Sequence, residues 1–143
     1  TFFYNSLTFL MNDPNLFKMK QLDTILVIDD SSTNVVLIEA VLNNKGYQIA
    51  TALSVKEAYA LMDKHKPKLI LLDLLMPRIN GFDFLKEIKE NKNFQDIPVI
   101  VVSALTDIET INKTKELGAV GFIKKPIDIH QLLELVENIF VKK

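Results

Sequence analysis

The residues best suited to chemistry are polar side chains that come directly after apolar runs. They comprise three carboxylates, one hydroxyl and a lysine pair: Asp29, Asp30, Asp73, Ser103, Lys124 and Lys125. Three carboxylates in one cleft repel one another unless a counter-charge is present, and oxygen ligands with room for water suit Mg²⁺. A lysine and a hydroxyl beside them can bind an incoming anion. Together these groups favour phosphoryl transfer, in which a carboxylate can be the nucleophile and form an acyl phosphate.

Each of these residues alone has an ordinary structural explanation. A single aspartate after a strand most often caps a helix or a turn, and the Asp-Asp pair at 29–30, followed by two serines, can be only an N-cap cluster. Ser103 alone fits a cap or a turn, and Lys125 alone fits a solvated surface charge. The functional interpretation therefore depends on whether the fold brings these side chains to one place.

The apolar runs that precede them are short and nearly continuous, as expected for strands covered on both faces. We predict strands at residues 25–28, 47–52, 69–72, 99–102 and 120–123. Amphipathic segments alternate with these runs, which predicts an α/β fold with a doubly wound parallel sheet and helices on both faces. In such a sheet the carboxyl ends of the strands share one edge, and ligands bind there. The carboxylates, the hydroxyl and the lysine are therefore expected to converge.

Capping signals predict where several of the helices begin and end. Residues 54–57 and 106–109 each match a capping box, which places helix starts near residues 55 and 107. Gly46 is expected to end a helix that runs from about residue 33. Asp128 is the expected N-cap of the last helix. That helix has one apolar face, formed by Leu132, Leu135, Val136 and Ile139.

The overall composition is that of a soluble globular domain. The 143 residues are 48% hydrophobic and 24% charged, with a formal net charge of −1 and no clustering of basic residues, which argues against a nucleic-acid surface. The absence of cysteine excludes disulfides and thiolate sites and fits a reducing, cytoplasmic location. No apolar run approaches the roughly 20 residues needed to cross a bilayer, so we expect no membrane association.

Four motifs in the right order resemble the receiver domain of two-component response regulators. They are ILVIDD at 25–30, LDLLMP at 72–77 with Asn80-Gly81, VVSA at 101–104 and GFIKKP at 121–126. The match covers about residues 24 to 141. The resemblance implies a flavodoxin-like (βα)5 fold with strand order 2-1-3-4-5. It also implies that a histidine kinase or a histidine phosphotransfer protein donates a phosphoryl group from a phosphohistidine.

The resemblance also implies a role for each residue of the site. Asp73 would be the phosphoacceptor, Asp30 would bind Mg²⁺ directly, and Asp29 would bind it mainly through water. The backbone carbonyl of Leu75 would complete the protein ligands of the metal. Ser103, in place of the commoner threonine, would donate a hydrogen bond to the phosphoryl group.

Of the two adjacent lysines, the family pattern selects Lys125 as the phosphate contact because it immediately precedes Pro126. That peptide bond is expected to be cis, and Lys124 would have no such role. Phe122 stands where the family has a switch aromatic, often tyrosine, so any switching must rest on packing alone. It could equally be a plain core phenylalanine.

Two loop features and one kinetic property complete the expectations from the resemblance. Pro77 and Gly81 are expected to shape the loop after Asp73, with Gly81 at positive φ. Leu75 and Leu105 are expected to flank the phosphoryl group, and neither can orient an attacking water. Our hypothesis is therefore a long-lived phosphorylated state. The fourth helix, the last strand and the last helix would form the surface for an output partner or a homodimer.

We divide the chain into an N-terminal extension or leader at 1–22 and a receiver domain at 23–143. The extension could form an apolar helix face for docking, or be a disordered or non-native leader. Alternative functions are the receiver piece of a hybrid histidine kinase, a phosphorylation-independent interaction domain, and an aspartate-nucleophile phosphatase. The phosphatase usually needs a second carboxylate where this chain has Leu75. His65 and His130 are interpreted as solvated helix residues rather than phosphorylation sites.

Overall fold

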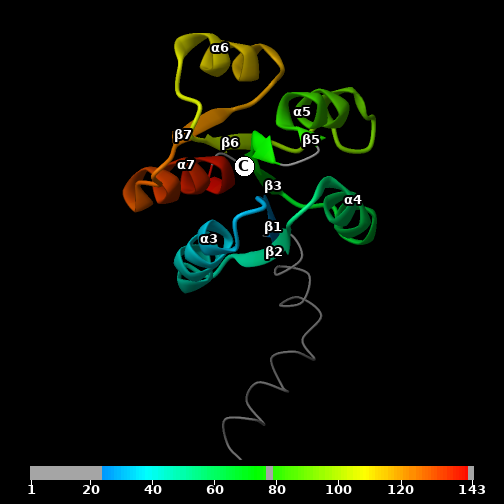
Figure 1. Ribbon diagram of the computed structural model, residues 1–143. Helices are drawn as coiled ribbons and strands as arrows, with labels where there is room; N and C mark the ends of the chain where they lie inside the picture. The colour runs from blue at the N-terminus through cyan, green and yellow to red at the C-terminus, as the bar shows by residue number, and fades with distance from the viewer. Residues whose placement is uncertain (1–23, 77–78, 142–143) are drawn as a thin grey trace, which may run out of the picture.

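The computed structural model describes residues 24–76 and 79–141, which contain every helix and strand named below (Figure 1). The predicted extension at 1–22 and Pro77 lie outside the described residues. None of the helices in the described part of the chain is long and apolar enough to cross a bilayer.

A five-stranded parallel sheet forms the centre of the molecule. Its strands are β1 (Thr24–Ile28), β2 (Gln48–Ala52), β3 (Leu69–Asp73), β6 (Val99–Ser103) and β7 (Gly121–Lys124). They lie in the order β2-β1-β3-β6-β7, which is 2-1-3-4-5 when only these strands are counted. The predicted fold class and strand order are confirmed. β1, β3 and β6 are buried along their whole length, because helices cover both faces of the sheet.

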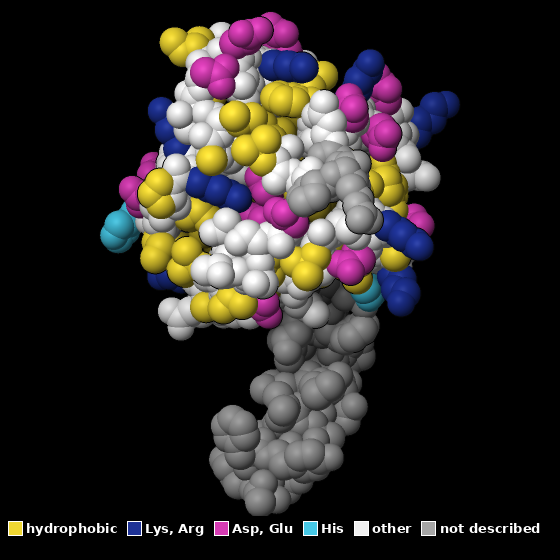
Figure 2. All heavy atoms as spheres, viewed as in Figure 1, with side chains coloured by type: hydrophobic (Ala, Val, Ile, Leu, Met, Phe, Trp, Pro, Cys, Tyr) yellow, Lys and Arg dark blue, Asp and Glu magenta, His cyan; other side chains and the backbone are white. Residues whose placement is uncertain are grey.

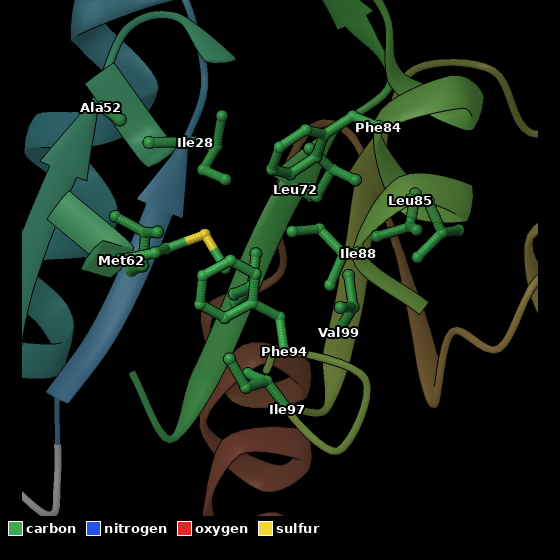
Figure 3. Packing of buried hydrophobic residues seen from close by; sticks show 14 of the residues in the cluster. Ile28, Ala52, Met62, Leu72, Phe84, Leu85, Ile88, Phe94, Ile97 and Val99 are labelled. Atoms are coloured by element: carbon green, nitrogen blue, oxygen red, sulfur yellow. The ribbon is translucent and has the colours of Figure 1, made fainter. Parts of the chain in front are cut away.

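The described residues form five helices, of which the first four connect strands of the sheet and the last follows the final strand (Figure 1). They are α3 (Ser32–Asn44), α4 (Val55–Lys64), α5 (Gly81–Glu90), α6 (Ile108–Glu116) and α7 (Ile129–Val141). α3 and α7 pack on one face of the sheet, and α4 and α5 pack on the other. Figure 3 shows side chains of α4, α5 and the segment before β6 meeting over β3, with Met62 and Phe94 pointing toward one another.

The capping predictions are confirmed for three helices and wrong by one residue for the fourth. Ser54 accepts a hydrogen bond from the backbone N–H of Glu57, Asp128 caps the start of α7, and Gly46, at φ 91°, follows the end of α3. α6 begins at Ile108 with Asp107 rather than Thr106 as its N-cap. The Asp107 carboxylate accepts hydrogen bonds from both the N–H and the hydroxyl of Thr110. Asp107 therefore caps the helix in place of Thr106, the predicted N-cap.

A short antiparallel hairpin after β3 was not predicted. Its strands are β4 (Leu75–Met76) and β5 (Ile79–Asn80), with Leu75 paired to Asn80. Asn80 also caps α5, because its side-chain oxygen accepts a hydrogen bond from the N–H of Phe82. The hairpin therefore connects the end of β3, where Asp73 lies, directly to the start of α5.

Candidate functional site

Three carboxylates meet at the carboxyl edge of the sheet, although they come from two separate strands. One oxygen from each of Asp29, Asp30 and Asp73 lies within 4.8 Å of the others. Asp29 and Asp73 are almost completely buried, with exposed fractions of 2% and 3%, whereas Asp30 is exposed. Figure 2 shows acidic side chains gathered in the middle of this face. The convergence predicted from the strand ends is therefore observed.

The two buried aspartates are held by the backbone that follows them. Asp29 Oδ1 accepts a hydrogen bond from the N–H of Ser31 at 2.8 Å, and Asp73 Oδ1 accepts one from the N–H of Leu75 at 3.1 Å. Each carboxylate therefore uses one oxygen to fix its own loop, in the manner of an Asx turn. The other oxygen, Oδ2, contacts a lysine in both cases.

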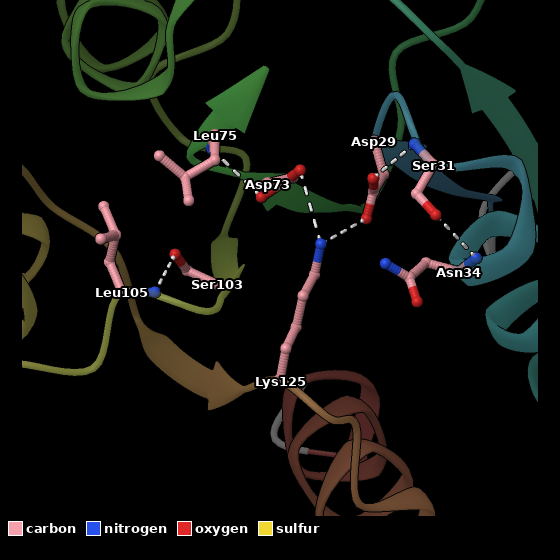
Figure 4. A network of polar contacts seen from close by, with 8 residues as sticks. All are labelled: Asp29, Ser31, Asn34, Asp73, Leu75, Ser103, Leu105 and Lys125. Atoms are coloured by element: carbon pink, nitrogen blue, oxygen red, sulfur yellow. Dashed lines mark hydrogen bonds and ion pairs between the residues drawn. The ribbon is translucent and has the colours of Figure 1, made fainter. Parts of the chain in front are cut away.

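That lysine is Lys125, which lies between the two buried carboxylates (Figure 4). Its Nζ is 3.0 Å from Asp29 Oδ2 and 3.4 Å from Asp73 Oδ2. The Lys125-Pro126 peptide bond is cis, as expected, and the Lys125 N–H donates to the carbonyl of Ser103. The side chain of Lys124, at the end of β7, is exposed. The structure thus brings the lysine that precedes the proline, rather than its neighbour, to the carboxylates.

The carboxyl group of Asp73 is electrostatically unusual. Its pKa is raised from the ordinary 3.8 to about 6, chiefly because burial disfavours the charged form. The charge of Asp29 also raises the pKa, whereas the Leu75 N–H and Lys125 lower it. Ionising Asp73 therefore costs more than ionising an ordinary aspartate, and a neighbouring cation would lower that cost. An oxygen-only donor set with this property fits a hard divalent cation such as Mg²⁺.

Ser103 occupies the end of β6, next to the site, and its side chain is completely buried. Its hydroxyl oxygen accepts a hydrogen bond from the N–H of Leu105 at 3.0 Å, so it orders the loop that leads to α6. Figure 4 shows Ser103 and Leu105 on one side of Lys125 and Asp29 on the other. The hydroxyl of Ser103, the ammonium of Lys125 and the carboxylate of Asp73 therefore lie close together at the sheet edge (Figure 4).

The fold, the acidic cluster and the lysine agree with a comparison of the chain with known families. The model of the response regulator receiver domain family matches residues 25–137. The chain belongs to this family.

Relatives of the receiver domain differ greatly in length. Sporulation initiation phosphotransferase F of Bacillus subtilis is 33% identical over 116 residues, which cover 81% of this chain and 92% of that protein. Response regulator PleD of Caulobacter vibrioides is 36% identical over 115 residues, which cover 80% of this chain but 25% of PleD. The chain therefore spans about a quarter of the length of that relative.

Solved structures of receiver domains have the same fold. A response regulator receiver protein from Pseudomonas putida is 31% identical, has a TM-score of 0.77, and is matched over 82% of this chain and 97% of its own. The signal receiver domain of a histidine kinase from Syntrophus aciditrophicus is 29% identical, has a TM-score of 0.76, and is matched over 84% of this chain and 91% of its own. The receiver domain is thus homologous to phosphoacceptor domains of two-component systems.

One expectation about the loop after Asp73 is wrong. Gly81 was expected at positive φ, but the positive-φ glycines of the described residues are Gly46 and Gly118. Gly81 is the first residue of α5, and a Cβ there would lie 2.5 Å from the Cα of Leu74. The glycine is required by a close approach of two backbone segments, which depends on the tertiary fold and leaves no local signal in the sequence.

The surroundings of Phe122 in the receiver domain fit a core residue, and its role as a switch stays a prediction. It is half-buried on β7 and packs against the core cluster that contains Leu72 and Val101. It also lines a hollow of about 160 Å³. The other lining residues belong to α6 and the segment up to β7: Ile111, Thr114, Lys115, Ala119, Val120 and Gly121. A phenylalanine here is therefore a core residue with space beside it.

Neither histidine belongs to the acidic cluster found among the described residues. His65 ends α4 as its C-cap, and His130 is in the first turn of α7. Both side chains are exposed, as expected for solvated residues.

Proposed function

We propose that the receiver domain accepts a phosphoryl group on Asp73 and that this modification switches a protein-interaction surface. The observation that carries the proposal is the position of Lys125 Nζ between the buried carboxylates of Asp29 and Asp73. A lysine paired with the acceptor before reaction can pair with a phosphoryl oxygen after it, because both partners are anionic oxygens.

In the proposed reaction, the ionised carboxylate oxygen of Asp73 attacks phosphorus and forms the acyl phosphate bond. The bond from phosphorus to the donor nitrogen of a phosphohistidine breaks, and the imidazole leaves with that electron pair. Lys125 neutralises charge on the phosphoryl oxygens, and the hydroxyl of Ser103 donates a hydrogen bond to one of them. Positioning and charge neutralisation supply most of the catalysis in such a transfer.

Asp29, Asp30 and Asp73, with the backbone carbonyl of Leu75, are the residues that we propose hold Mg²⁺. Asp30 would bind the ion directly and Asp29 mainly through water. When bound, Mg²⁺ supplies positive charge that offsets the repulsion between the carboxylates and the incoming phosphoryl group. The raised pKa of Asp73 supports this assignment, because a cation beside it favours the ionised, nucleophilic form.

The proposed donor is a histidine kinase or a histidine phosphotransfer protein, since receiver domains interact with such proteins. The proposed surface for an output partner or a second copy of the chain is formed by α6, β7 and α7. Exposed apolar side chains on it support this role, among them Ile108 and Val120. A cytoplasmic location belongs to the same proposal, with the absence of cysteine as its support.

We propose a phosphoacceptor switch rather than an enzyme that turns over a separate substrate. An aspartate-nucleophile phosphatase usually has a second acid or base carboxylate two residues after the nucleophile, and this position holds Leu75. The receiver piece of a hybrid histidine kinase remains the second candidate. The similarity to the histidine kinase receiver domain from Syntrophus aciditrophicus favours it.

Beryllofluoride, an analogue of the phosphoryl group, tests the proposal by NMR. In ¹⁵N spectra with Mg²⁺, beryllofluoride is expected to shift the amides of Asp73, Ser103 and Lys125 in the wild-type protein. The Asp73→Asn variant should fold and show none of these shifts. Equal shifts in both proteins would contradict the assignment of Asp73, and steady hydrolysis of free phosphomonoesters would favour the phosphatase.

A further inference from the structure

The start of α5 touches the backbone beside the proposed phosphoacceptor. Gly81 is buried, and a Cβ added to it would lie 2.5 Å from the Cα and 2.8 Å from the carbonyl oxygen of Leu74. Leu74 is the residue between Asp73 and Leu75. Contacts this short do not occur between real Cβ atoms and backbone, so any side chain at position 81 must displace one of the two segments.

Several interactions keep these segments together. The N–H of Gly81 donates to the carbonyl of Leu74 at 3.2 Å, and Leu75 pairs with Asn80 in the small hairpin. The side chain of Leu74 is 3% exposed and belongs to the hydrophobic core. The atoms that face Gly81 are backbone atoms of a residue anchored in the core, so they cannot move aside as the end of a flexible side chain would.

Displacement of Leu74 would move the two groups on either side of it. One is Asp73, whose carboxylate is fixed by the N–H of Leu75 at 3.1 Å. The other is the Leu75 carbonyl, a proposed ligand of the metal. Mg²⁺ requires near-ideal octahedral geometry at about 2.0–2.1 Å, and functional groups must be held within about 0.5 Å of their productive positions. Such a ligand set tolerates little movement.

We propose that Gly81 is a positioning residue for the metal site. The absence of a side chain lets α5 approach Leu74 and thereby sets the Leu75 carbonyl against the Asp73 carboxylate at the spacing that Mg²⁺ needs. The inference rests on the proposed function, because it concerns affinity for the same ion. It assigns part of that affinity to a residue that has no polar side chain and does not contact the ion.

The test compares Mg²⁺ affinity in the wild-type protein, Gly81→Ala and Gly46→Ala, by titrating MgCl₂ and following ¹⁵N amide shifts. Gly46 is the control because its φ of 91° strains an alanine while a Cβ there meets nothing within 4 Å. Gly81→Ala is expected to weaken Mg²⁺ binding by at least about tenfold, the usual effect of residues that orient metal ligands. Gly46→Ala should leave the affinity unchanged.

A second readout separates a positioning role from general destabilisation. With acetyl phosphate as donor, Gly81→Ala should raise the Mg²⁺ concentration for half-maximal phosphorylation, and saturating Mg²⁺ should restore much of the rate. A folded Gly81→Ala variant with wild-type Mg²⁺ affinity would overturn the inference and leave the proposed function intact. A wild-type protein that binds no Mg²⁺ would overturn the proposed function itself.

Hydrogen exchange in the wild-type protein tests the inference if Gly81→Ala fails to fold. Mg²⁺ binding should slow exchange of the Gly81 amide, because its bond to the Leu74 carbonyl becomes coupled to a bound ligand. The amides of Gly46 and Gly118 should not change. Unchanged exchange at Gly81 under saturating Mg²⁺ would contradict the coupling.

Discussion

The acidic edge of the sheet and the surface around α6 are neighbouring regions that differ in how far their side chains are buried and hydrogen-bonded. At the edge, Asp29 and Asp73 are nearly fully buried, accept backbone hydrogen bonds, and share one lysine. Within the described part of α6, Thr114 is the one buried residue, and Ile108 is 77% exposed. The hollow of about 160 Å³ lies between this helix and β7.

The difference matches two physical requirements. Phosphoryl transfer needs charged groups in fixed positions, because catalysis comes from preorganised electrostatics. A switching surface needs elements that move at small energetic cost, and segments with few buried apolar contacts meet that requirement. The two regions are joined at Ser103, whose hydroxyl holds the N–H of Leu105 in the loop that leads to α6. We therefore expect a phosphoryl group that binds the hydroxyl of Ser103 to change the structure around α6 before it changes the acidic edge.

The largest expected difference between the regions is in folding stability. Leu72, on β3 beside Asp73, is completely buried, so Leu72→Ala should lower the free energy of unfolding by about 2–5 kcal/mol. Ile108→Ala should change it by less than about 0.5 kcal/mol, because that side chain remains mostly in water. Urea denaturation of the two variants measures both values. Equal losses would mean that α6 is packed as firmly as the sheet.

The second comparison uses the two adjacent lysines. Lys125→Ala should slow phosphorylation by acetyl phosphate about 100-fold, the usual effect of removing one preorganised charge partner. Lys124→Ala should leave the rate near the wild-type value, because its side chain is exposed at the end of β7. The rates follow from mass spectrometry of the intact protein over time. Equal effects of the two variants would contradict the assignment of Lys125.

The Asp73 carboxyl at the acidic edge should also make folding stability depend on pH in the absence of metal. Because the pKa of Asp73 is raised from 3.8 to about 6, the folded protein binds more protons than the unfolded chain between those values. Stability should therefore fall as pH rises through about 4 to 6, and the penalty should be complete above that window.

The Asp73→Asn variant lacks this group and should have the higher Tm in EDTA at about pH 7. Its advantage should shrink toward about pH 4, where the wild-type carboxyl has become protonated in the folded state. Thermal denaturation at several pH values measures the difference. An advantage that is constant across the range would mean that the Asp73 carboxyl is not the cause.

The smallest expected effect concerns the lifetime of the phosphorylated state. Leu75 and Leu105 are apolar and lie beside the site, so neither can orient a water for hydrolysis (Figure 4). Leu75→Asn or Leu105→Glu should speed loss of the phosphoryl group by about tenfold, a barrier change of about 1.4 kcal/mol. Val120→Asn, on the α6–β7 surface, is the matched control and should have no effect. If both site variants lost the phosphoryl group at the wild-type rate or more slowly, the hypothesis would be contradicted.

Most of the fold was predictable from the sequence because its signals are local. The strand runs are almost continuously apolar, and each predicted strand boundary lies within one residue of the observed one. The site could be predicted for a related reason. Parallel strands place their carboxyl ends on one edge, so the positions of Asp29, Asp73 and the Lys124-Lys125 pair after apolar runs were enough to predict their convergence. The choice of Lys125 over Lys124 came from the resemblance to the family.

The features that were missed depend on contacts between distant segments or on competition between neighbours. The hairpin of β4 and β5 has two-residue strands, too short to show any periodicity. Thr106 and Asp107 both suit an N-cap, and the sequence does not show which one the helix uses. The steric need for Gly81 exists only because α5 packs on Leu74. In each case the outcome depends on contacts that exist only in the folded protein.

The central claim is that Asp73, aided by Lys125 and a divalent cation, accepts the phosphoryl group. The most direct test is intact-mass analysis after incubation with acetyl phosphate and Mg²⁺, followed by peptide mapping of the modified site. We predict a gain of one phosphoryl group on the peptide that contains Asp73, absent with EDTA and absent in Asp73→Asn. A modification that forms without Mg²⁺, or that persists in Asp73→Asn, would contradict the account.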